Sequence, residues 1–257
     1  MDDTMPVVLS VQEATKRFGG VTAVNNVNLE VHKGDRYLLI GTNGAGKSTL
    51  FNLICGDLPL TNGKIVLFGQ NVTHKSVRQR AALGMRRTYQ ATALFPKLTV
   101  RQNLYLAILG TQPLIKHFNL FKDYRDSSAY TEEIEKVAAD VMLLPKVDER
   151  VMNLSHGEHR QLELGLALIA KPKLLLLDEP SSGLSENERA LMRKMLLALD
   201  KEITLLMVEH NMELAFSVAS RVTVMYDGEV VFEGTPEETQ KSELVQSIYL
   251  GAGGKNQ

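Results

Sequence analysis

The sequence predicts an α/β fold in which a parallel core sheet is joined to an N-terminal antiparallel β subdomain and an inserted helical subdomain. Solid apolar runs at 37–40, 174–177 and 203–208 are typical of strands buried on both faces of a parallel sheet. Each is followed by a loop and a helical pattern, and this repeated order indicates an α/β core. Near the N-terminus, 7–11 and 27–31 instead alternate apolar and polar residues, as strands with one buried face do.

Turn residues bound the other predicted strands. Asn62–Gly63 is a turn signal, and the segment 64–68 that follows it is predicted to be a hairpin strand. Near the C-terminus, Asp227–Gly228 separates 222–226 from 229–232, which predicts a strand, a tight turn and a second strand.

Helical periodicity marks two further segments. After the first buried run, Leu50, Leu53 and Ile54 share one face of a helix that Gly56 would end. Farther along, one face of a second helix is predicted from apolar residues that recur at helical spacing between charged ones, namely Tyr130, Ile134, Val137, Ala138 and Val141.

Length and spacing together predict the domain organisation. At 257 residues and 28.5 kDa, the chain has the size of one domain or of one core with an insertion. We expect a single domain over 6–250, with the helical subdomain inserted at 91–160. Residues 251–257 are expected to form a flexible tail.

Composition excludes several classes of protein. The 29 Lys and Arg residues balance 30 Asp and Glu, so bulk electrostatic attraction to nucleic acid is not expected. The one cysteine, Cys55, excludes an internal disulfide and a cysteine-cluster metal site, and is expected to be a small core residue. Because no apolar run approaches the ~20 residues of a membrane-spanning helix, and the N-terminus has no signal-peptide pattern, the chain is not expected to cross a membrane by itself.

Residues 41–48 form the most specific motif. They read Gly-Thr-Asn-Gly-Ala-Gly-Lys-Ser and match G-x-x-x-x-G-K-[ST] between a buried strand and a helix. Glycines let successive N–H groups face phosphate oxygens, and the helix N-terminus adds partial positive charge. Lys47 is predicted to reach the β- and γ-phosphates of a nucleotide, and the Ser48 hydroxyl to ligate Mg²⁺. The alternative is a glycine-rich turn with a surface lysine, which the strand and helix on either side disfavour.

A second motif ends the buried run at 174–177. Asp178 and Glu179 follow directly, at the carboxyl end of the predicted strand, where ligands bind in open α/β sheets. Neighbouring residues point in different directions from a strand, so the two carboxylates can take two roles. Asp178 is predicted to hold Mg²⁺, directly or through water, and Glu179 to polarise the water that attacks the γ-phosphate. The alternative is a loop boundary that carries two acids by chance.

With these two motifs, the chain resembles an ATP-binding-cassette (ABC) ATPase subunit. Between them, Leu154-Ser155-His156-Gly157-Glu158 resembles the family's signature L-S-G-G-Q, with His156 in place of glycine and Glu158 in place of glutamine. The resemblance covers roughly residues 7–251 and implies the P-loop NTPase core of the ABC ATPase fold. It also implies that the signature opens a helix and binds the γ-phosphate of ATP held by an opposing subunit. Taken alone, this segment has an ordinary helix cap as its alternative.

The resemblance implies further roles. Gln90 matches a glutamine that contacts Mg²⁺ and water, His210 a histidine that contacts the γ-phosphate, and Phe18 an aromatic residue that stacks on adenine. Taken singly, each has a simpler alternative: an exposed amide, a strand-end histidine and a core phenylalanine. Ser185 departs from the pattern, because the family often has an aspartate there.

The complete set of implied site residues follows from these matches. The ATP-binding residues are Phe18, Gly41, Thr42, Asn43, Gly44, Ala45, Gly46, Lys47, Ser48 and Thr49. The signature residues are Ser155, His156, Gly157 and Glu158. The Mg²⁺ ligands are Ser48, Gln90 and Asp178, and the catalytic residues are Lys47, Gln90, Glu179 and His210.

Within the family, the segments 16–20, 154–157, 183–186 and 249–251 look most like the ATPases of branched-chain amino acid importers, with urea and short-amide importers as close cousins. This resemblance implies ATP and Mg²⁺ as cofactors. The implied partners are a second ABC ATPase subunit, identical or paralogous, two integral-membrane permease subunits and a substrate-binding protein, with no nucleic acid. The implied location is cytoplasmic, on the inner face of the cell membrane.

Three functions follow as hypotheses. The first is a motor ATPase that binds two ATP between two such subunits and drives a permease through its helical insertion. The second is an ABC ATPase acting on nucleic acid or ribosomes, but such proteins typically carry two cassettes or a long coiled coil, which this chain lacks. The third is a regulatory subunit with degenerate catalysis, which the presence of Glu179 and His210 disfavours.

Overall fold

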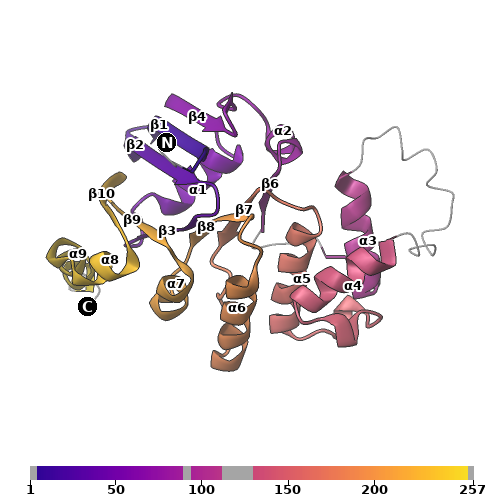
Figure 1. Ribbon diagram of the computed structural model, residues 1–257. Coiled ribbons are helices and arrows are strands. Elements are labelled where there is room, and N and C mark those ends of the chain that lie inside the picture. Colours follow the sequence, from indigo (N-terminus) through magenta and orange to yellow (C-terminus); the bar gives the residue numbers. More distant parts are fainter. Residues whose placement is uncertain (1–4, 89–93, 112–129, 254–257) are drawn as a thin grey trace. The chain divides into compact units, whose positions relative to one another are not determined.

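The structure, a computed structural model, forms two units, the first built on two β-sheets and the second on helices (Figure 1). It describes residues 5–88, 94–111 and 130–253, with side chains as far as Tyr249. The first unit comprises 1–87, 173–179 and 201–257, and the second comprises 88–172 and 180–200. Among the described residues, every helix is too short or too polar to span a membrane.

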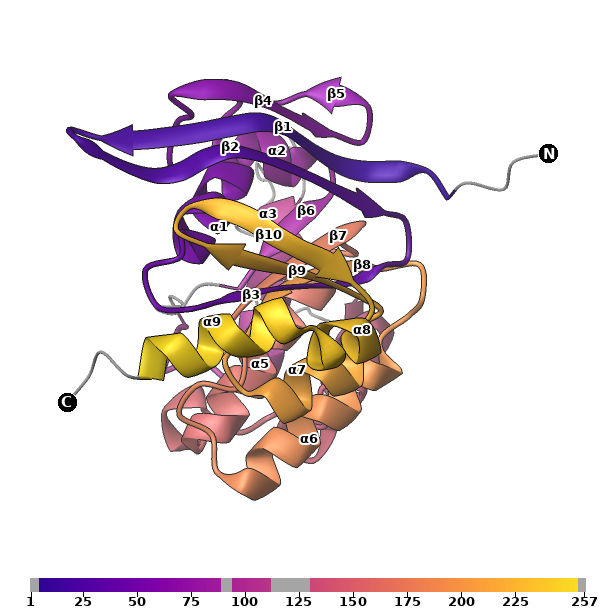
Figure 2. The same ribbon diagram turned by 90° about the vertical axis from the view of Figure 1, so that its left-hand side faces the viewer.

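The first unit begins with an antiparallel sheet in the strand order β2-β1-β4-β5. Its strands are β1 (Val7–Phe18), β2 (Val21–His32), β4 (Asn62–Leu67) and β5 (Gln70–Asn71). Figure 2 shows β1 and β2 side by side as a long hairpin, with β4 paired to the other edge of β1. The predicted antiparallel subdomain is confirmed, and its first two strands extend well beyond the predicted 7–11 and 27–31.

Asn62 and Gly63 do not form the turn that the sequence predicted, because β4 already begins there. The pairing of β4 with β1 shifts register between Gln12 and Thr15. Gly63 has φ +99°, and a Cβ at this position would lie 2.5 Å from the carbonyl oxygen of Glu13. The glycine therefore permits a close approach of two strands at an irregularity in the ladder, which is a different use of the same residue type.

The second sheet has the strand order β10-β9-β3-β8-β7-β6. Its strands are β3 (Arg36–Gly41), β6 (Met85–Arg87), β7 (Leu174–Asp178), β8 (Thr204–Val208), β9 (Arg221–Tyr226) and β10 (Glu229–Gly234). All neighbours are parallel except β9 and β10, which form the predicted C-terminal hairpin. The solid apolar runs are central strands, so the predicted α/β class is confirmed. Since β3 and β7 are parallel, Gly41 and Asp178 end at the same edge of the sheet.

The helices of the first unit are α1 (Lys47–Cys55), α2 (Val77–Ala82), α7 (Met212–Val218), α8 (Pro236–Lys241) and α9 (Glu243–Gly253). As predicted, α1 ends before Gly56, and its apolar face is buried in the core. Cys55 is also buried there, and burial raises the pKa of its thiol to about 12, so it is an inert core residue.

The C-terminal end differs from the sequence expectation. Because α9 continues through Gly253, the predicted tail at 251–257 begins as helix, and 254–257 lie outside the described residues. A helix already formed from Glu243 can add further residues without a new nucleation cost.

The second unit contains α3 (Val100–Thr111), α4 (Thr131–Asp140), α5 (His156–Leu168) and α6 (Glu186–Ala198), with short 3₁₀ helices at Leu144–Lys146 and Val151–Asn153. The apolar face predicted around α4 is buried at Ile134, Val137, Ala138 and Val141. The predicted insertion at 91–160 lies within this unit, which also takes in 161–172 and 180–200. The boundaries at 91 and 160 remain a prediction.

A buried arginine closes the C-terminal end of α1. Arg80 donates from Nη1 to Leu53 O and Ile54 O, both at 2.7 Å, and from Nε to Lys75 O at 3.0 Å. We expect Arg80→Met to lower the free energy of unfolding by about 2–4 kcal/mol, because it removes these hydrogen bonds from a charged donor at a buried position. Urea unfolding would measure this. The control is Arg78→Met, at an exposed position of α2, the helix that also carries Arg80. Equal stability of the two variants would contradict the expectation.

Candidate nucleotide-binding site

The glycine-rich motif joins β3 to α1, as its sequence predicted. Gly41 has φ +151° and Gly46 has φ +97°. A Cβ on Gly41 would lie 2.1 Å from Met225 O, and one on Gly46 would lie 2.3 Å from Ala23 O. The neighbouring strands β9 and β2 thus leave room only for glycine at both ends of the loop.

Lys47 is the first residue of α1, and its ammonium group lies inside the loop. Nζ donates to Gly41 O at 2.7 Å and to Thr42 O at 2.9 Å. Burial lowers the pKa of this lysine, and the charge of Glu179 acts in the opposite direction. The motif therefore carries a fixed internal cation, and the alternative of a surface lysine is excluded.

The N-terminus of α1 offers backbone donors to an anion. Gly46 is the N-cap and has no side chain to accept from the first turn. The N–H groups of that turn, beginning with Lys47, Ser48 and Thr49, have no acceptor within the helix. Together with the positive end of the helix dipole, they form the kind of N-terminus that binds phosphate.

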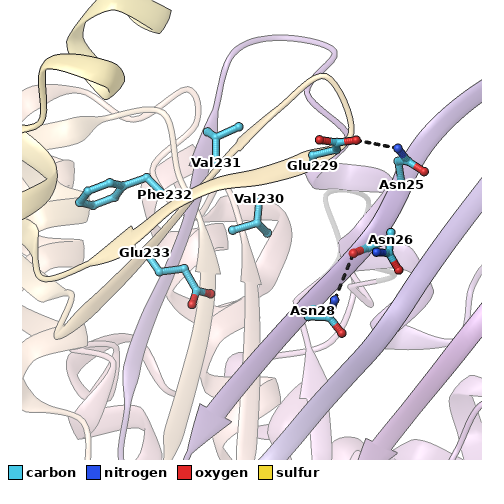
Figure 3. Close-up of a pocket in the computed structure, with 8 residues that line it drawn as sticks. All are labelled: Asn25, Asn26, Asn28, Glu229, Val230, Val231, Phe232 and Glu233. Carbon is cyan, nitrogen blue, oxygen red and sulfur yellow. Dashed lines mark hydrogen bonds between the residues drawn. The ribbon is translucent and has the colours of Figure 1, made fainter.

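Hydrogen bonds brace the loop against β2 and the β9–β10 turn. The N–H of Gly228 donates to Ala45 O at 3.1 Å, and the N–H of Asn25 donates to Gly228 O at 2.8 Å. Asn25 also donates from Nδ2 to Glu229 Oε1 at 2.6 Å, across an open groove of about 490 Å³ between β2 and β10 (Figure 3). The contact across this groove joins the edges of two sheets and supports the loop from one side.

Asp178 ends β7 and pairs with a residue that the sequence had not singled out. Its Oδ2 accepts from Arg87 Nη2 at 2.9 Å, while Arg87 Nη1 donates to Asn52 Oδ1 and Asp57 Oδ2 at 2.7 and 2.6 Å. The one available signal was the charged pair Arg86–Arg87 at the end of a strand. Arg87 fixes one oxygen of Asp178 and ties α1 to the core sheet.

The second oxygen of Asp178 fits a cation ligand. Oδ1 is buried, and no residue of the described segments 5–88, 94–111 and 130–253 bonds to it. Buried carboxylate oxygens usually have a partner, and a metal ion is one of the ordinary partners of an oxygen that no protein group bonds. Hard oxygen donors of this kind suit Mg²⁺, so the donor present fits the predicted metal.

Glu179 and His210 come together from adjacent strands. Glu179 follows β7, its N–H donates to Val208 O at 2.8 Å, and its φ is +50°, a conformation uncommon outside glycine. His210 follows β8, and its Nε2 lies 3.0 Å from Glu179 Oε1. Both side chains are partly exposed, so a proton acceptor and a possible donor stand next to each other where ligand and water can reach them.

Phe18 and Gln90 complete the predicted nucleotide site. Phe18 ends β1 with 47% of its surface exposed, and Lys16 Nζ lies 5.0 Å from its ring centre. The alternative of a core phenylalanine is therefore wrong, and the exposed ring is free to stack. Gln90 lies outside the described residues.

The signature segment belongs to the second unit. Ser155 is the N-cap of α5, and its Oγ accepts from the Glu158 N–H at 3.3 Å while its own N–H donates to Glu158 Oε2 at 2.9 Å. Glu158 Oε1 also pairs with Lys146 Nζ at 2.6 Å. The glutamate in place of glutamine thus completes a capping box, and the expected helix opening is present.

Ser185 stands where the family often has an aspartate, and it caps α6, the next helix of the same unit. Its Oγ accepts from the Glu188 N–H at 3.5 Å, and its N–H donates to Glu188 Oε2 at 2.9 Å at the start of α6. Serine and aspartate are comparably good N-caps, so this substitution preserves the helix start.

The loop, the acidic strand end and the parallel sheet define a P-loop nucleotide-binding protein. In comparisons with known proteins, the ABC transporter family matches residues 24–182. The branched-chain amino acid transport ATP-binding protein LivG of Escherichia coli K12 is 34% identical over 249 residues, which are 95% of this chain and 98% of LivG. BraF of Pseudomonas aeruginosa, described in the same words, is 34% identical over 252 residues, 95% of this chain and 98% of BraF.

A solved structure agrees with these matches. MJ1267, an ATP-binding cassette of an ABC transporter in its ADP conformation, superposes with a TM-score of 0.84 and 28% identity, covering 96% of this chain and all of MJ1267. The chain belongs to the ABC transporter family, and it is one of the family's ATP-hydrolysing cassettes. The predicted ABC ATPase fold is confirmed.

Proposed function

We propose that this chain is the motor subunit of an ABC transporter that imports branched-chain or other hydrophobic amino acids. The observation that carries the chemistry is the close pair of Glu179 and His210 at the sheet edge where the loop that leads to Lys47 also begins. The substrate class rests on LivG and BraF, whose names describe branched-chain amino acid transport.

In the proposed reaction, water forms a bond to the γ-phosphorus of ATP and the bond to the β,γ-bridging oxygen breaks, so that ADP and phosphate leave. Glu179 accepts the proton that the attacking water loses. His210, which pairs with Glu179 before nucleotide binds, turns to donate to the γ-phosphate. Lys47 and the first-turn amides of α1 hold the β- and γ-phosphates in line for this attack.

The other predicted site residues would hold Mg²⁺ and adenine. Ser48, Gln90 and Asp178 are the proposed Mg²⁺ ligands, and the bound ion would neutralise charge on the phosphate oxygens. Arg87 fixes Oδ2 of Asp178, so that its Oδ1 would be available to hold the ion. The exposed ring of Phe18 would stack on adenine.

The proposed partners are a second ABC ATPase subunit, two permease subunits and a substrate-binding protein, with the whole assembly at the inner face of the membrane. The signature supports the second subunit, because Ser155 and Gly157 would bind the ATP of an opposing cassette. To test this, the complex would be isolated from native membranes through a tag on this chain, and its subunits identified. ATP-dependent leucine uptake by the complex in vesicles supports the proposal, whereas uptake of urea or amides, or no membrane partner, contradicts it.

Whether the working pair is two copies of this chain is testable by mixing two damaged variants. Lys47→Ala removes the phosphate-loop half of a site, and Ser155→Arg blocks the signature half with bulk and charge. A mixed homodimer would have one site with both changes and one intact site, which restores part of the ATPase rate if one site can work alone. We expect no restoration in the native complex, because the importers that this chain most resembles usually pair two different ATPases. Clear restoration there would overturn the heterodimer expectation.

A further inference from the structure

The carboxylate of Glu188, on α6, lies against the backbone of the signature. A Cβ built on Gly157 would be 2.3 Å from Glu188 Oε1, and the nearby Gly157 N–H helps to hold the pKa of this carboxyl below its usual value. Glu188 Oε2 accepts from the Ser185 N–H at 2.9 Å and from its hydroxyl at 2.7 Å. One carboxylate therefore serves both the cap of its own helix and the first turn of α5.

The Gly157 amide depends on a partner outside its own helix. Gly157 is the second residue of α5, and the first N–H groups of a helix have no acceptor within it. The cap, Ser155, accepts instead from the Glu158 N–H. Glu188 thus supplies a negatively charged acceptor at the point where the signature would meet a phosphate.

We propose that Glu188 is an internal anion that occupies the Gly157 amide until the γ-phosphate of ATP on an opposing subunit replaces it. The inference rests on the proposed function, because it takes Gly157 as the signature residue that meets this phosphate. A carboxylate and a phosphate at one N–H repel each other, so the two occupants exclude one another. Closure of two cassettes then exchanges one anion for the other, and Glu188 weakens the apparent affinity for ATP.

Two of the three departures from the family pattern, Ser185 and His156, lie at this contact. The Ser185 hydroxyl and, more weakly, the His156 ring help to hold the pKa of Glu188 below its usual value, which keeps it an anion. His156 Nε2 would lie 3.0 Å from a Cβ on Gly183, so the ring rests on the loop that leads to α6. An adjoining hollow of about 160 Å³ gives the carboxylate space to leave the amide, and its lining includes Ser155, Gly157, Leu184, Glu188 and Met192.

Glu188→Gln removes the negative charge of this side chain but can keep its hydrogen bond in the capping box of α6. In α2 of this same chain, Gln79 Oε1 accepts from the Ser76 N–H at 2.9 Å in an equivalent capping box, so glutamine can keep the cap. When its oxygen faces Ser185, its NH₂ group faces the Gly157 N–H and cannot accept from it. Glu238→Gln, in the Thr235–Glu238 capping box of α8, removes one charge from the same kind of cap and is the matched control.

The first measurement is hydrogen exchange of the Gly157 amide, followed by NMR in the purified full chain. We expect roughly tenfold faster exchange in Glu188→Gln than in the unmodified protein, as for the loss of one charge-assisted hydrogen bond. Glu238→Gln should leave this amide unchanged. Equal protection of Gly157 in Glu188→Gln would overturn the contact on which the proposal depends.

The second measurement is the ATP dependence of hydrolysis in the transporter complex isolated through this chain. Because the internal competitor is gone, Glu188→Gln should lower KM for ATP roughly threefold to tenfold, with Glu238→Gln at the normal value. An unchanged or raised KM, with hydrolysis still dependent on Lys47, would overturn this inference alone. Hydrolysis that does not depend on Lys47 would instead overturn the proposed function and the inference with it.

Discussion

Glu179→Gln is expected to bind ATP with near-normal affinity and to hydrolyse it about 10²–10⁴ times more slowly, the usual cost of losing a general base. Glutamine keeps the size of the side chain and an oxygen that can accept from His210, but it cannot take a proton from the attacking water. The charge of Glu179 opposes the lowering of the Lys47 pKa by burial, so its loss lowers that pKa further, but the phosphates of bound ATP supply a new negative charge beside the ammonium group.

Single-turnover hydrolysis of ATP by the complex would measure this, with a parallel binding titration. Glu202→Gln is the control: it removes one carboxylate that lies 2.6 Å from Lys33 on the exposed surface of the same unit, and its rate should be normal. A near-normal hydrolysis rate in Glu179→Gln would place the general base elsewhere. An equal loss of binding and of hydrolysis would show that Glu179 holds nucleotide instead.

The strands and the phosphate loop were predictable because their determinants are local. A strand that is buried on both faces must be apolar throughout, and a loop that wraps phosphates needs glycine at φ values such as the +97° of Gly46. The turn predicted at Asn62–Gly63 was wrong for the same local reason. Glycine is suited to a tight turn, but it is equally suited to a place where two strands come close, as Gly63 and Glu13 do. Composition alone does not tell the two uses apart.

The contacts that tune the site could not be read from the sequence because they join distant segments. Arg87 reaches Asp178 across 91 positions, and nothing in either residue type names the other. Glu188 and Gly157 meet only after two helices of the second unit have packed. The substitutions at 156 and 185 looked like independent departures along the chain, whereas in the fold both lie around one carboxylate.

Lys47→Ala is expected to weaken MgATP binding by about 10²-fold or more, which corresponds to two hydrogen bonds made by a charged donor. The ammonium group is already fixed in the loop by Gly41 O and Thr42 O, so the protein spends little entropy in presenting it to the phosphates. Alanine leaves these carbonyls facing the phosphate charge without the cation between them, and repulsion adds to the lost attraction.

Titration with a fluorescent ATP analogue would give the affinity, and thermal unfolding would show that the variant is folded. Lys33→Ala removes a lysine charge from the exposed surface of the same unit and should bind normally, which separates the local effect of Lys47 from a change in net charge. Unchanged affinity and unchanged hydrolysis in a folded Lys47→Ala protein would rule out the glycine-rich loop as the nucleotide site.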